Sequence, residues 1–226
     1  MKKIILIWGC IICMSITLQA QTAKWFVGFP TGYVMGGPAA SIKSLMNDQG
    51  YNQTGNSLFG PMNFPTKSYN PPLMIMAGKQ ISPYGSLYIL VGQSDASTVT
   101  GYNGYYTISE QFNILQTTLG YQFTFPQSHF KLGIGPSFFI FHHEVANYLP
   151  VTQSTETKPG VSLMARLPFG KENKLFGIEL FFAMNIAGSV QLNDVHENFF
   201  NDELDFTGGK LSMVSAMLGL NFVFKK

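Results

Sequence analysis

The feature that most constrains this chain is a regular alternation of large apolar residues with small or polar ones over long segments. Between residues 130 and 140, every second position is apolar, and the intervening positions hold Lys131, Gly133, Gly135, Ser137 and Phe139. The same rhythm occupies 115–125, 176–186 and 214–224. A period of two indicates β-strands. These strands are about twice as long as the 5–6 residues of an ordinary soluble strand and match the roughly 9–11 needed to cross a bilayer.

The second face of each strand distinguishes a membrane barrel from a soluble sandwich. A soluble sheet buries its apolar face and shows charge on the other. Here the second face carries mostly Gly, Ser, Thr, Gln and Asn, and charged residues make up only 12% of the chain, against about 25% in ordinary domains. The pattern predicts a barrel with a crowded, polar interior and an apolar outer face in lipid.

Strands and connections alternate along the whole chain. We expect eight strands, at about 24–34, 71–82, 85–96, 105–125, 129–145, 157–169, 174–190 and 209–224. Tight turns are expected at 82–85, 126–129 and 170–174, and longer loops near 35–70, 97–104, 146–156 and 191–208. Short turns on one side and long loops on the other are typical of outer-membrane barrels. An even strand count closes the sheet, and lipid favours closure because it cannot satisfy bare backbone groups.

The first long loop contains the one predicted helix. Ile42, Leu45 and Met46 share a helical face within 39–47, which predicts a short helix capping the barrel mouth. The segment 59–72 is rich in Gly, Pro and Asn and is expected to be irregular.

Residues 1–20 have the layout of a secretory signal peptide. Lys2 and Lys3 precede an apolar run from Ile4 to Ile16, and Ala20 provides a small residue at the expected cleavage position. The alternative, a membrane anchor, needs about 20 apolar residues. Residues 21–226 then form a single β-barrel domain. Both cysteines lie in the removed segment, which excludes a disulfide-stapled scaffold and cysteine-based metal or thiol chemistry.

The remaining charge and hydropathy exclude two further classes. Without Lys2 and Lys3, basic and acidic residues are equal in number, so no basic field exists to hold nucleic acid. No later apolar run approaches the length of a transmembrane helix.

The last strand carries a short assembly motif. Gly219, Phe222 and Phe224 match a pattern of glycine, two arbitrary residues, an aromatic, a spacer and a terminal aromatic. This resembles the C-terminal β-signal of outer-membrane proteins, although Lys225 and Lys226 follow it here. The whole segment 21–226 resembles the small outer-membrane β-barrels of the OmpX and OmpA type. The resemblance implies the bacterial outer membrane, recognition by the barrel-assembly machinery and periplasmic termini, but no single activity.

One pair of charges is expected inside the barrel. Arg166, the only arginine, and Glu179 fall on the polar faces of consecutive strands. A tight turn at 171–174 would place them opposite each other. Because unpaired buried charges are costly, they are expected to pair, as a structural plug rather than a gate or binding site.

His142, His143 and Glu144 near the outer rim are the only candidates for catalysis. A histidine base needs a nucleophile within hydrogen-bond reach. Ser137 shares the inward face with His143 but lies about 20 Å away along the strand. Solvated rim histidines are therefore expected, and no catalytic residue is predicted.

The last loop is acidic and contains aromatics. Its carboxylates are expected to be solvated, with Ca²⁺ binding or partner contact through the aromatics as the alternatives. These residues are Asp194, Glu197, Asp202, Glu203 and Asp205, with Phe199, Phe200 and Phe206.

Aromatic girdles are expected at both membrane interfaces. The periplasmic girdle would contain Trp25, Tyr84, Phe123, Phe125, Phe130, Phe169, Phe222 and Phe224, and the outer girdle Tyr102, Tyr105, Tyr106 and Tyr148.

The expected function is non-enzymatic: an integral outer-membrane protein with a structural or surface-contact role. A narrow channel or a transporter of small hydrophobic ligands is the alternative, and a lipid-modifying enzyme is a weaker one. No cofactor or metal is expected. Expected partners are outer-membrane lipids, the assembly machinery and a surface ligand bound through the loops.

Overall fold

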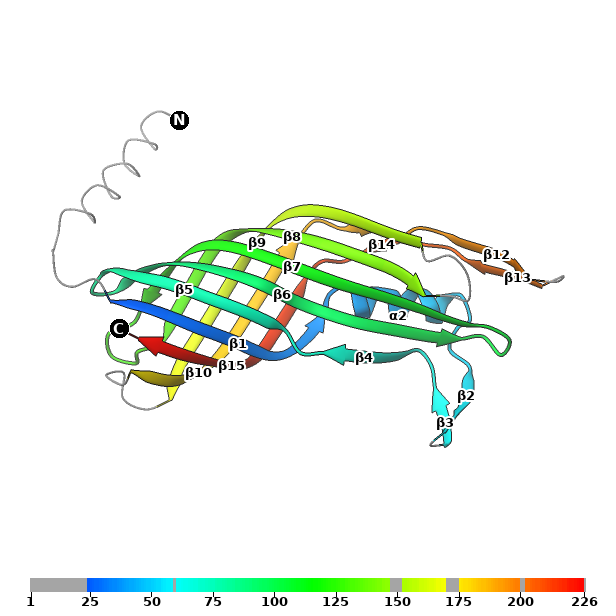
Figure 1. The fold of residues 1–226 in the computed structure, drawn as a ribbon, viewed down its shortest axis with the longest axis horizontal. Coiled ribbons are helices and arrows are strands. Elements are labelled where there is room, and N and C mark those ends of the chain that lie inside the picture. The colour runs from blue at the N-terminus through cyan, green and yellow to red at the C-terminus, as the bar shows by residue number, and fades with distance from the viewer. Residues whose placement is uncertain (1–23, 59, 147–151, 170–174, 200–201, 226) are drawn as a thin grey trace, which may run out of the picture.

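A closed antiparallel barrel forms the body of the molecule (Figure 1). The computed structural model describes residues 24–58, 60–146, 152–169, 175–199 and 202–225, without the side chains of 57, 146, 152, 195–199 and 202–205. The long strands are β1 (Trp25–Gly36), β5 (Leu73–Ser82), β6 (Gly85–Tyr102), β7 (Thr107–Thr124), β8 (Lys131–Ala146), β9 (Thr152–Phe169), β10 (Phe176–Ala187) and β15 (Ser215–Lys225). The order β6-β5-β1-β15-β10-β9-β8-β7 closes through a β6–β7 ladder. The predicted eight-stranded barrel is confirmed.

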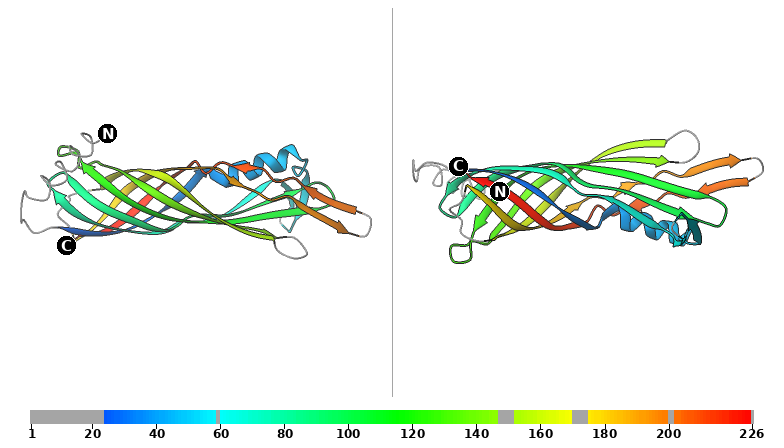
Figure 2. Two further views of the ribbon diagram at one scale, coloured as in Figure 1. Left: turned by 90° about the horizontal axis from the view of Figure 1, so that it is seen from above. Right: turned by 60° about the horizontal axis from the view of Figure 1, so that its bottom comes forward.

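Shorter elements gather at one end of the barrel. They are α2 (Gly37–Asp48), β2 (Thr54–Ser57), β3 (Gly60–Asn63), β4 (Thr66–Asn70), β11 (Val190–Gln191), β12 (Val195–Phe199), β13 (Asp202–Phe206) and β14 (Lys210–Leu211). Together with the adjoining ends of β6–β9 we call them the head. Figures 1 and 2 show the head at one end and the described ends of the chain, near Trp25 and Lys225, at the other, which we call the turn end. Among the described residues, no helix is long and apolar enough to span a bilayer.

The strand lengths explain the head. β6, β7 and β9 each have 18 residues and β8 has 16, whereas a bilayer needs about 9–11 per strand. About seven residues of each therefore continue beyond the membrane, roughly 20 Å along the strand. The expected loops at 97–104 and 146–156 were too long, because β6 runs to Tyr102 and β9 begins at Thr152.

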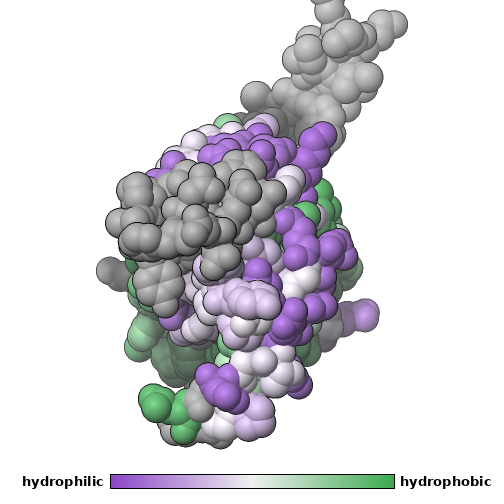
Figure 3. Space-filling view, turned by 90° about the vertical axis from the view of Figure 1, so that its right-hand side faces the viewer, coloured by the Kyte–Doolittle hydropathy of each residue, from purple (hydrophilic) through white to green (hydrophobic). Residues whose placement is uncertain are grey.

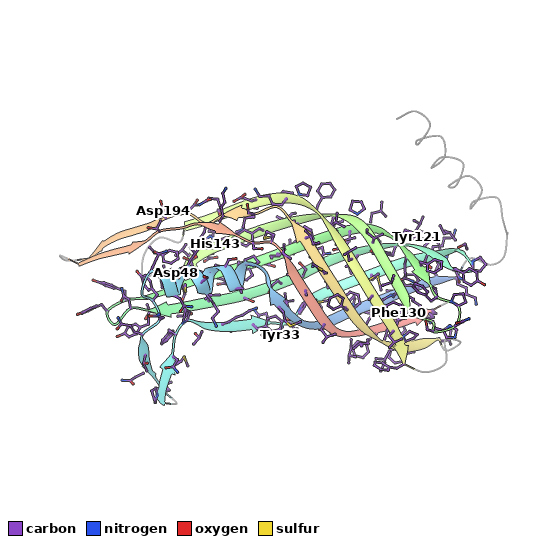
Figure 4. All side chains as sticks on the ribbon, turned by 180° about the vertical axis from the view of Figure 1, so that it is seen from behind. Tyr33, Asp48, Tyr121, Phe130, His143 and Asp194 are labelled. Carbon is purple, nitrogen blue, oxygen red and sulfur yellow. The ribbon has the colours of Figure 1, made fainter. Side chains whose placement is uncertain are left out.

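The outer face carries a continuous apolar belt. Leu119, Ile134 and Phe138 are 56–63% exposed, while their neighbours Thr118, Gly133 and Ser137 are buried. In water such a belt would be far larger than a soluble monomer exposes. The belt has the alternation predicted for a strand that faces lipid on one side and a filled interior on the other. Figure 4 shows Tyr121 and Phe130 near the turn end, with Tyr33 between them and the head residues His143 and Asp194.

The helix α2 begins where β1 ends. Gly36 and Gly37 both have positive φ, 74° and 69°, a conformation that glycine adopts at no steric cost. Pro38 then occupies the first turn of the helix, where its missing N–H is not needed. Ile42 and Met46 are fully buried beneath the helix. The predicted helix is present and three residues longer than expected.

The segment 59–72 is not irregular throughout, as the sequence suggested. β3 pairs with β2, and β4 pairs with Ala96–Thr100 of β6. The β4–β6 pairing keeps the same register as the β5–β6 pairing, with Asn70 opposite Ala96 and Leu73 opposite Gln93. β4 and β5 are thus one strand interrupted by Pro71 and Pro72.

Candidate functional site

The bore is closed near the turn end by a cluster of charged and amide side chains. Glu179 accepts a hydrogen bond from Lys131 at 2.8 Å and lies 3.1 Å from an Arg166 guanidinium nitrogen. The side chain of Asn221 donates to the second Glu179 oxygen at 3.0 Å, and Arg166 donates to Gln122. All five are at least 94% buried. We call these residues the charged layer.

The charged layer shows how a narrow barrel accommodates ions. Two cations surround one carboxylate, and the amides of Gln122 and Asn221 supply further hydrogen bonds, which a buried ion pair needs to offset its desolvation. The Arg166 guanidinium also lies 4.9 Å above the ring of Phe26, a cation–π contact. This arrangement stabilises a closed bore.

The expected alignment of Arg166 with Glu179 was wrong. Arg166 is opposite Phe181, and Glu179 is opposite Pro168, so the register differs by two residues from that expected. The two side chains meet diagonally instead. A shift of two preserves which face each residue occupies, so both still point into the bore.

Above the charged layer lie an apolar and a polar layer. The apolar one contains Val34, Met74, Met76, Tyr88, Leu90, Met164, Phe181, Ala183 and Met217, and we call it the methionine cluster. The polar one is a hydrogen-bonded group in which Gln116 donates to Ser162 at 2.7 Å and to Asn185 at 3.2 Å, and Thr118 bonds to Ser137 at 2.7 Å. Because such networks polarise one another and exclude water, they rigidify the interior.

The head has its own apolar core, which we call the head core. Helix α2 provides Ala39, Ile42 and Met46 on one side, and the strands and hairpins provide Tyr51, Val99, Ile108, Phe112, Ile114, Phe139, Phe141, Val145, Val190, Leu192, Phe206, Leu211 and Met213. The expectation of a polar interior therefore holds only partly. Above the membrane, the inward faces contact one another and α2, so they are apolar as in a soluble domain.

His143 is buried in the head core, contrary to the expectation of a solvated rim histidine. Its Nε2 is hydrogen-bonded to Glu110, and the two residues are at most 1% exposed. Its ring stacks on Phe141 at a centroid distance of 6.0 Å. Glu110 was missed in the sequence, although it shares the inward parity of Gln116 and Thr118.

Ser154 completes an unexpected arrangement around His143. It is directly opposite His143 on β9, and its hydroxyl has no hydrogen-bond partner among the described residues. Ser137, the serine weighed from the sequence, instead bonds to Thr118 and to the Gly135 carbonyl. In the observed hydrogen bond, His143 and Glu110 provide each other with a polar partner inside the apolar head core.

The acidic loop forms one long hairpin with two ladders in the same register, β11–β14 and, further out, β12–β13. Asp194 accepts a hydrogen bond from the Gly208 backbone at 2.8 Å, and Phe206 is fully buried in the head core rather than available to a partner. The side chains of Glu197, Phe199, Asp202, Glu203 and Asp205, and all of Phe200, lie outside the described residues. Among the described ones, no group of three or more His, Cys, Asp or Glu is placed to hold a metal ion.

The aromatic residues divide differently from the expected girdles. Trp25, Phe169 and Phe224 are 50–57% exposed at the turn end. Tyr102 and Tyr106, by contrast, belong to the head: Tyr102 donates to the Gly104 carbonyl at 2.6 Å, and Tyr106 packs on the head core. They lie beyond the belt because about seven residues of β6 continue past it. Tyr148 is outside the described residues. Figure 3 shows the head end, where hydrophilic residues predominate.

The three residues of the expected β-signal form a regular part of the β1–β15 ladder. Gly219 is opposite Gly32 of β1, Phe222 is opposite Phe29, and Phe224 is opposite Val27. Phe224 is half exposed in the belt and contacts the rings of Phe29 and Phe176 at centroid distances of 6.2 and 5.2 Å.

The fold is that of small outer-membrane β-barrels. The chain is similar to OprG of Pseudomonas aeruginosa, with 10% identity, a TM-score of 0.50, and coverage of 90% of this chain and 97% of that one. It is also similar to Ail of Yersinia pestis (10% identity, TM-score 0.44, 90% and 100% covered) and to Neisserial surface protein A (12%, 0.43, 90% and 99%). No family model and no curated protein matches the sequence.

Proposed function

We propose that this protein is a non-enzymatic integral protein of the bacterial outer membrane, in which a filled barrel anchors a packed, surface-exposed head. In this proposal, residues 1–20 are removed on export, and the barrel-assembly machinery recognises Gly219, Phe222 and Phe224. The turn end with both chain termini faces the periplasm. The surface ligand expected from the sequence binds to the head.

The observation that carries the proposal is the filling of the bore at successive levels, while four strands continue beyond the belt. The charged layer, the methionine cluster, the polar network and the head core follow one another along the axis. Barrels of this size have interiors filled by side chains. Because a filled barrel offers no aqueous path, the extension beyond the membrane is the part available for contact.

Conductance in planar bilayers tests the proposal. The refolded protein is expected to give no steady unitary currents, whereas an open porin in the same membranes serves as the positive control. The Ser137→Ala variant, which removes one hydroxyl from the polar network, is a matched control that should also remain silent. Reproducible unitary currents from the wild-type protein would contradict the anchor role.

Contact by the head is tested separately, with the purified protein in nanodiscs and intact cells or matrix polymers as the probes. Binding should survive substitutions in the belt and be lost when the β12–β13 hairpin is replaced by a short Gly-Ser turn. If neither the wild type nor this variant binds any surface probe, the contact role is wrong even though the anchor remains.

A further inference from the structure

The barrel wall contains an interrupted ladder between β1 and β5. These strands pair only from Trp25 to Gly28, opposite Lys79 to Met76. β1 nevertheless continues in register with β15 up to Gly36. Above Gly28, therefore, no backbone pairing joins β1 to β4 and β5 in the described part of the wall. We call this interval the seam.

Prolines account for the interruption. The Gly37 N–H donates to the carbonyl of Val214, the residue before β15, and the Lys24 carbonyl accepts from Gln80 of β5. By the antiparallel alternation, even-numbered residues of β1 therefore face the seam. Pro30 is one of them and has no N–H to donate. Pro71 and Pro72 break the opposing strand where the ladder would continue. Proline belongs at sheet edges rather than in central strands.

Tyr69 of β4 bridges the seam. The Tyr69 hydroxyl of β4 donates to the Gly32 carbonyl at 2.6 Å. The Tyr69 hydroxyl thus supplies the hydrogen-bond donor that a paired strand would otherwise give to β1 at Gly32. On its inner side the Tyr69 ring packs against the methionine cluster.

The seam runs from the belt, where β1 and β5 lie, to the edge of the head, where β4 lies, and it separates lipid from an adaptable interior. Its outer margins are Met35, Leu73 and Ile75, which are 46–74% exposed, whereas Val34 and Met74 directly behind are 2% exposed. Methionine side chains are flexible and fill irregular space. If Tyr69 moved aside, the lipid hydrocarbon would therefore adjoin the methionine cluster, whose side chains could rearrange around an alkyl chain.

A cation holds the bridging tyrosine in place. The Lys67 ammonium lies 5.2 Å from the ring centre of Tyr69 and 5.9 Å from that of Tyr33. Cation–π attraction at this distance favours the closed position of Tyr69. An anionic headgroup near Lys67 would compete with both rings for the ammonium.

We propose that the seam is a binding site for a single-chain anionic amphiphile, such as a fatty acid, with Tyr69 as its latch. The carboxylate pairs with Lys67, the phenol moves aside, and the alkyl chain lies between β1 and β5 against the methionine cluster. The inference goes beyond the anchoring role: it needs only the belt in a bilayer, and neither conductance nor head contact bears on it.

Cysteine labelling behind the latch tests the site, because the chain after residue 20 has no cysteine. In lipid vesicles, Val34→Cys places a thiol behind Tyr69. Ser137→Cys places a buried control thiol on β8 at a position that is paired on both sides, with Thr118 of β7 and Gly160 of β9. N-dodecylmaleimide is expected to label Val34→Cys about tenfold faster than Ser137→Cys, a difference of about one decade in rate. In combination with Tyr69→Ala, labelling of Val34→Cys should become faster, whereas labelling of Ser137→Cys should not.

Competition identifies the chemistry of the occupant. Dodecanoate is expected to slow labelling of Val34→Cys, dodecanol to slow it less, and Lys67→Met to abolish the difference between the two. If the Tyr69→Ala protein does not fold, as judged by heat-modifiable mobility in gels, Tyr69→Phe is used, since it retains the ring and loses the hydrogen bond to Gly32.

Three results would overturn the proposal. Equal labelling of the two thiols, with and without Tyr69→Ala, would show a closed wall. Equal acceleration of both thiols would show general loosening. Disulfide-linked dimers of Leu73→Cys at the exposed margin would show that the seam is an interface between copies instead.

Discussion

At the scale of single residues, Glu179 is the group on which the charged layer depends. Its carboxylate is shared by Lys131 and Arg166, whereas removing either cation leaves the other in place. Glu179→Ala is expected to reduce the free energy of unfolding by about 3 to 5 kcal/mol, because it leaves uncompensated buried charge. Urea titration of the protein refolded in lipid vesicles measures the change.

The matched comparison for Glu179 is Lys131→Met, which keeps the Arg166–Glu179 pair and much of the lysine side-chain volume. This variant should lose clearly less stability than Glu179→Ala. Equal losses would mean that packing, not charge compensation, determines the effect.

His143 and Glu110 provide a second residue-scale prediction. Both His143→Ala and Glu110→Ala leave a buried polar partner unsatisfied and should destabilise the head. The double variant His143→Phe with Glu110→Leu removes both polar groups while conserving volume. It should be closer to wild type than either single variant, as measured by proteolytic resistance of the head in vesicles.

A non-additive result of this kind would establish the pair as structural. If instead each single variant keeps wild-type resistance, the pair contributes nothing to the packing of the head, and the role of His143 must be sought elsewhere.

At the scale of elements, a glycine contact governs how β1 and β15 approach. A Cβ at Gly219 would lie 1.9 Å from the Thr31 carbonyl oxygen, and one at Gly32 would lie 2.3 Å from that of Leu218. Both are backbone atoms in the facing strand and cannot move aside alone. Gly32→Ala and Gly219→Ala should therefore both impair refolding in detergent, whereas Gly177→Ala, with no atom within 4 Å, should not.

Comparing Phe224 with Gly32 distinguishes packing of the strands from recognition of the motif by the assembly machinery. Phe224 is half exposed, so Phe224→Ala should refold in detergent almost normally but reach the outer membrane poorly if the assembly machinery reads it. Gly32→Ala lies outside the motif and should fail in both assays. Normal outer-membrane levels of Phe224→Ala would argue against the β-signal.

The extent of sequence-based prediction follows from what each pattern encodes. Alternation fixes which face a residue occupies, so the inward positions of Lys131, Arg166 and Glu179 could be predicted. It does not fix register, which depends on the turn before β10, and the expected pairing was off by two. Nor could alternation reveal Tyr69, because its role arises from contacts between β4 and β1, which are distant in sequence.

The head shows a second limit of prediction from the sequence. The inward parity of Glu110 was readable, but its burial with His143 depends on α2 and the hairpins covering the strands. A strand that leaves the membrane keeps its period of two while its inner surroundings change from a polar bore to an apolar core. Sequence periodicity alone therefore does not show where along a strand the polar bore gives way to the apolar head core.

At the scale of the whole molecule, the orientation of the barrel can be tested with the same cysteine-free background. Tyr105 is 88% exposed at the tip of the β6–β7 hairpin in the head, and Tyr84 is 48% exposed in the turn between β5 and β6. In the proposed orientation a membrane-impermeant maleimide added to intact cells should label Tyr105→Cys and not Tyr84→Cys.

Permeabilising the outer membrane should then make Tyr84→Cys reactive, while Leu119→Cys in the middle of the belt should remain unreactive in both conditions because hydrocarbon excludes a charged reagent. The three positions together define a polar head, an apolar belt and a polar turn end. Labelling of Tyr84→Cys on intact cells would invert the barrel, and labelling of Leu119→Cys would show that the belt faces water, which would remove the physical basis for a membrane location.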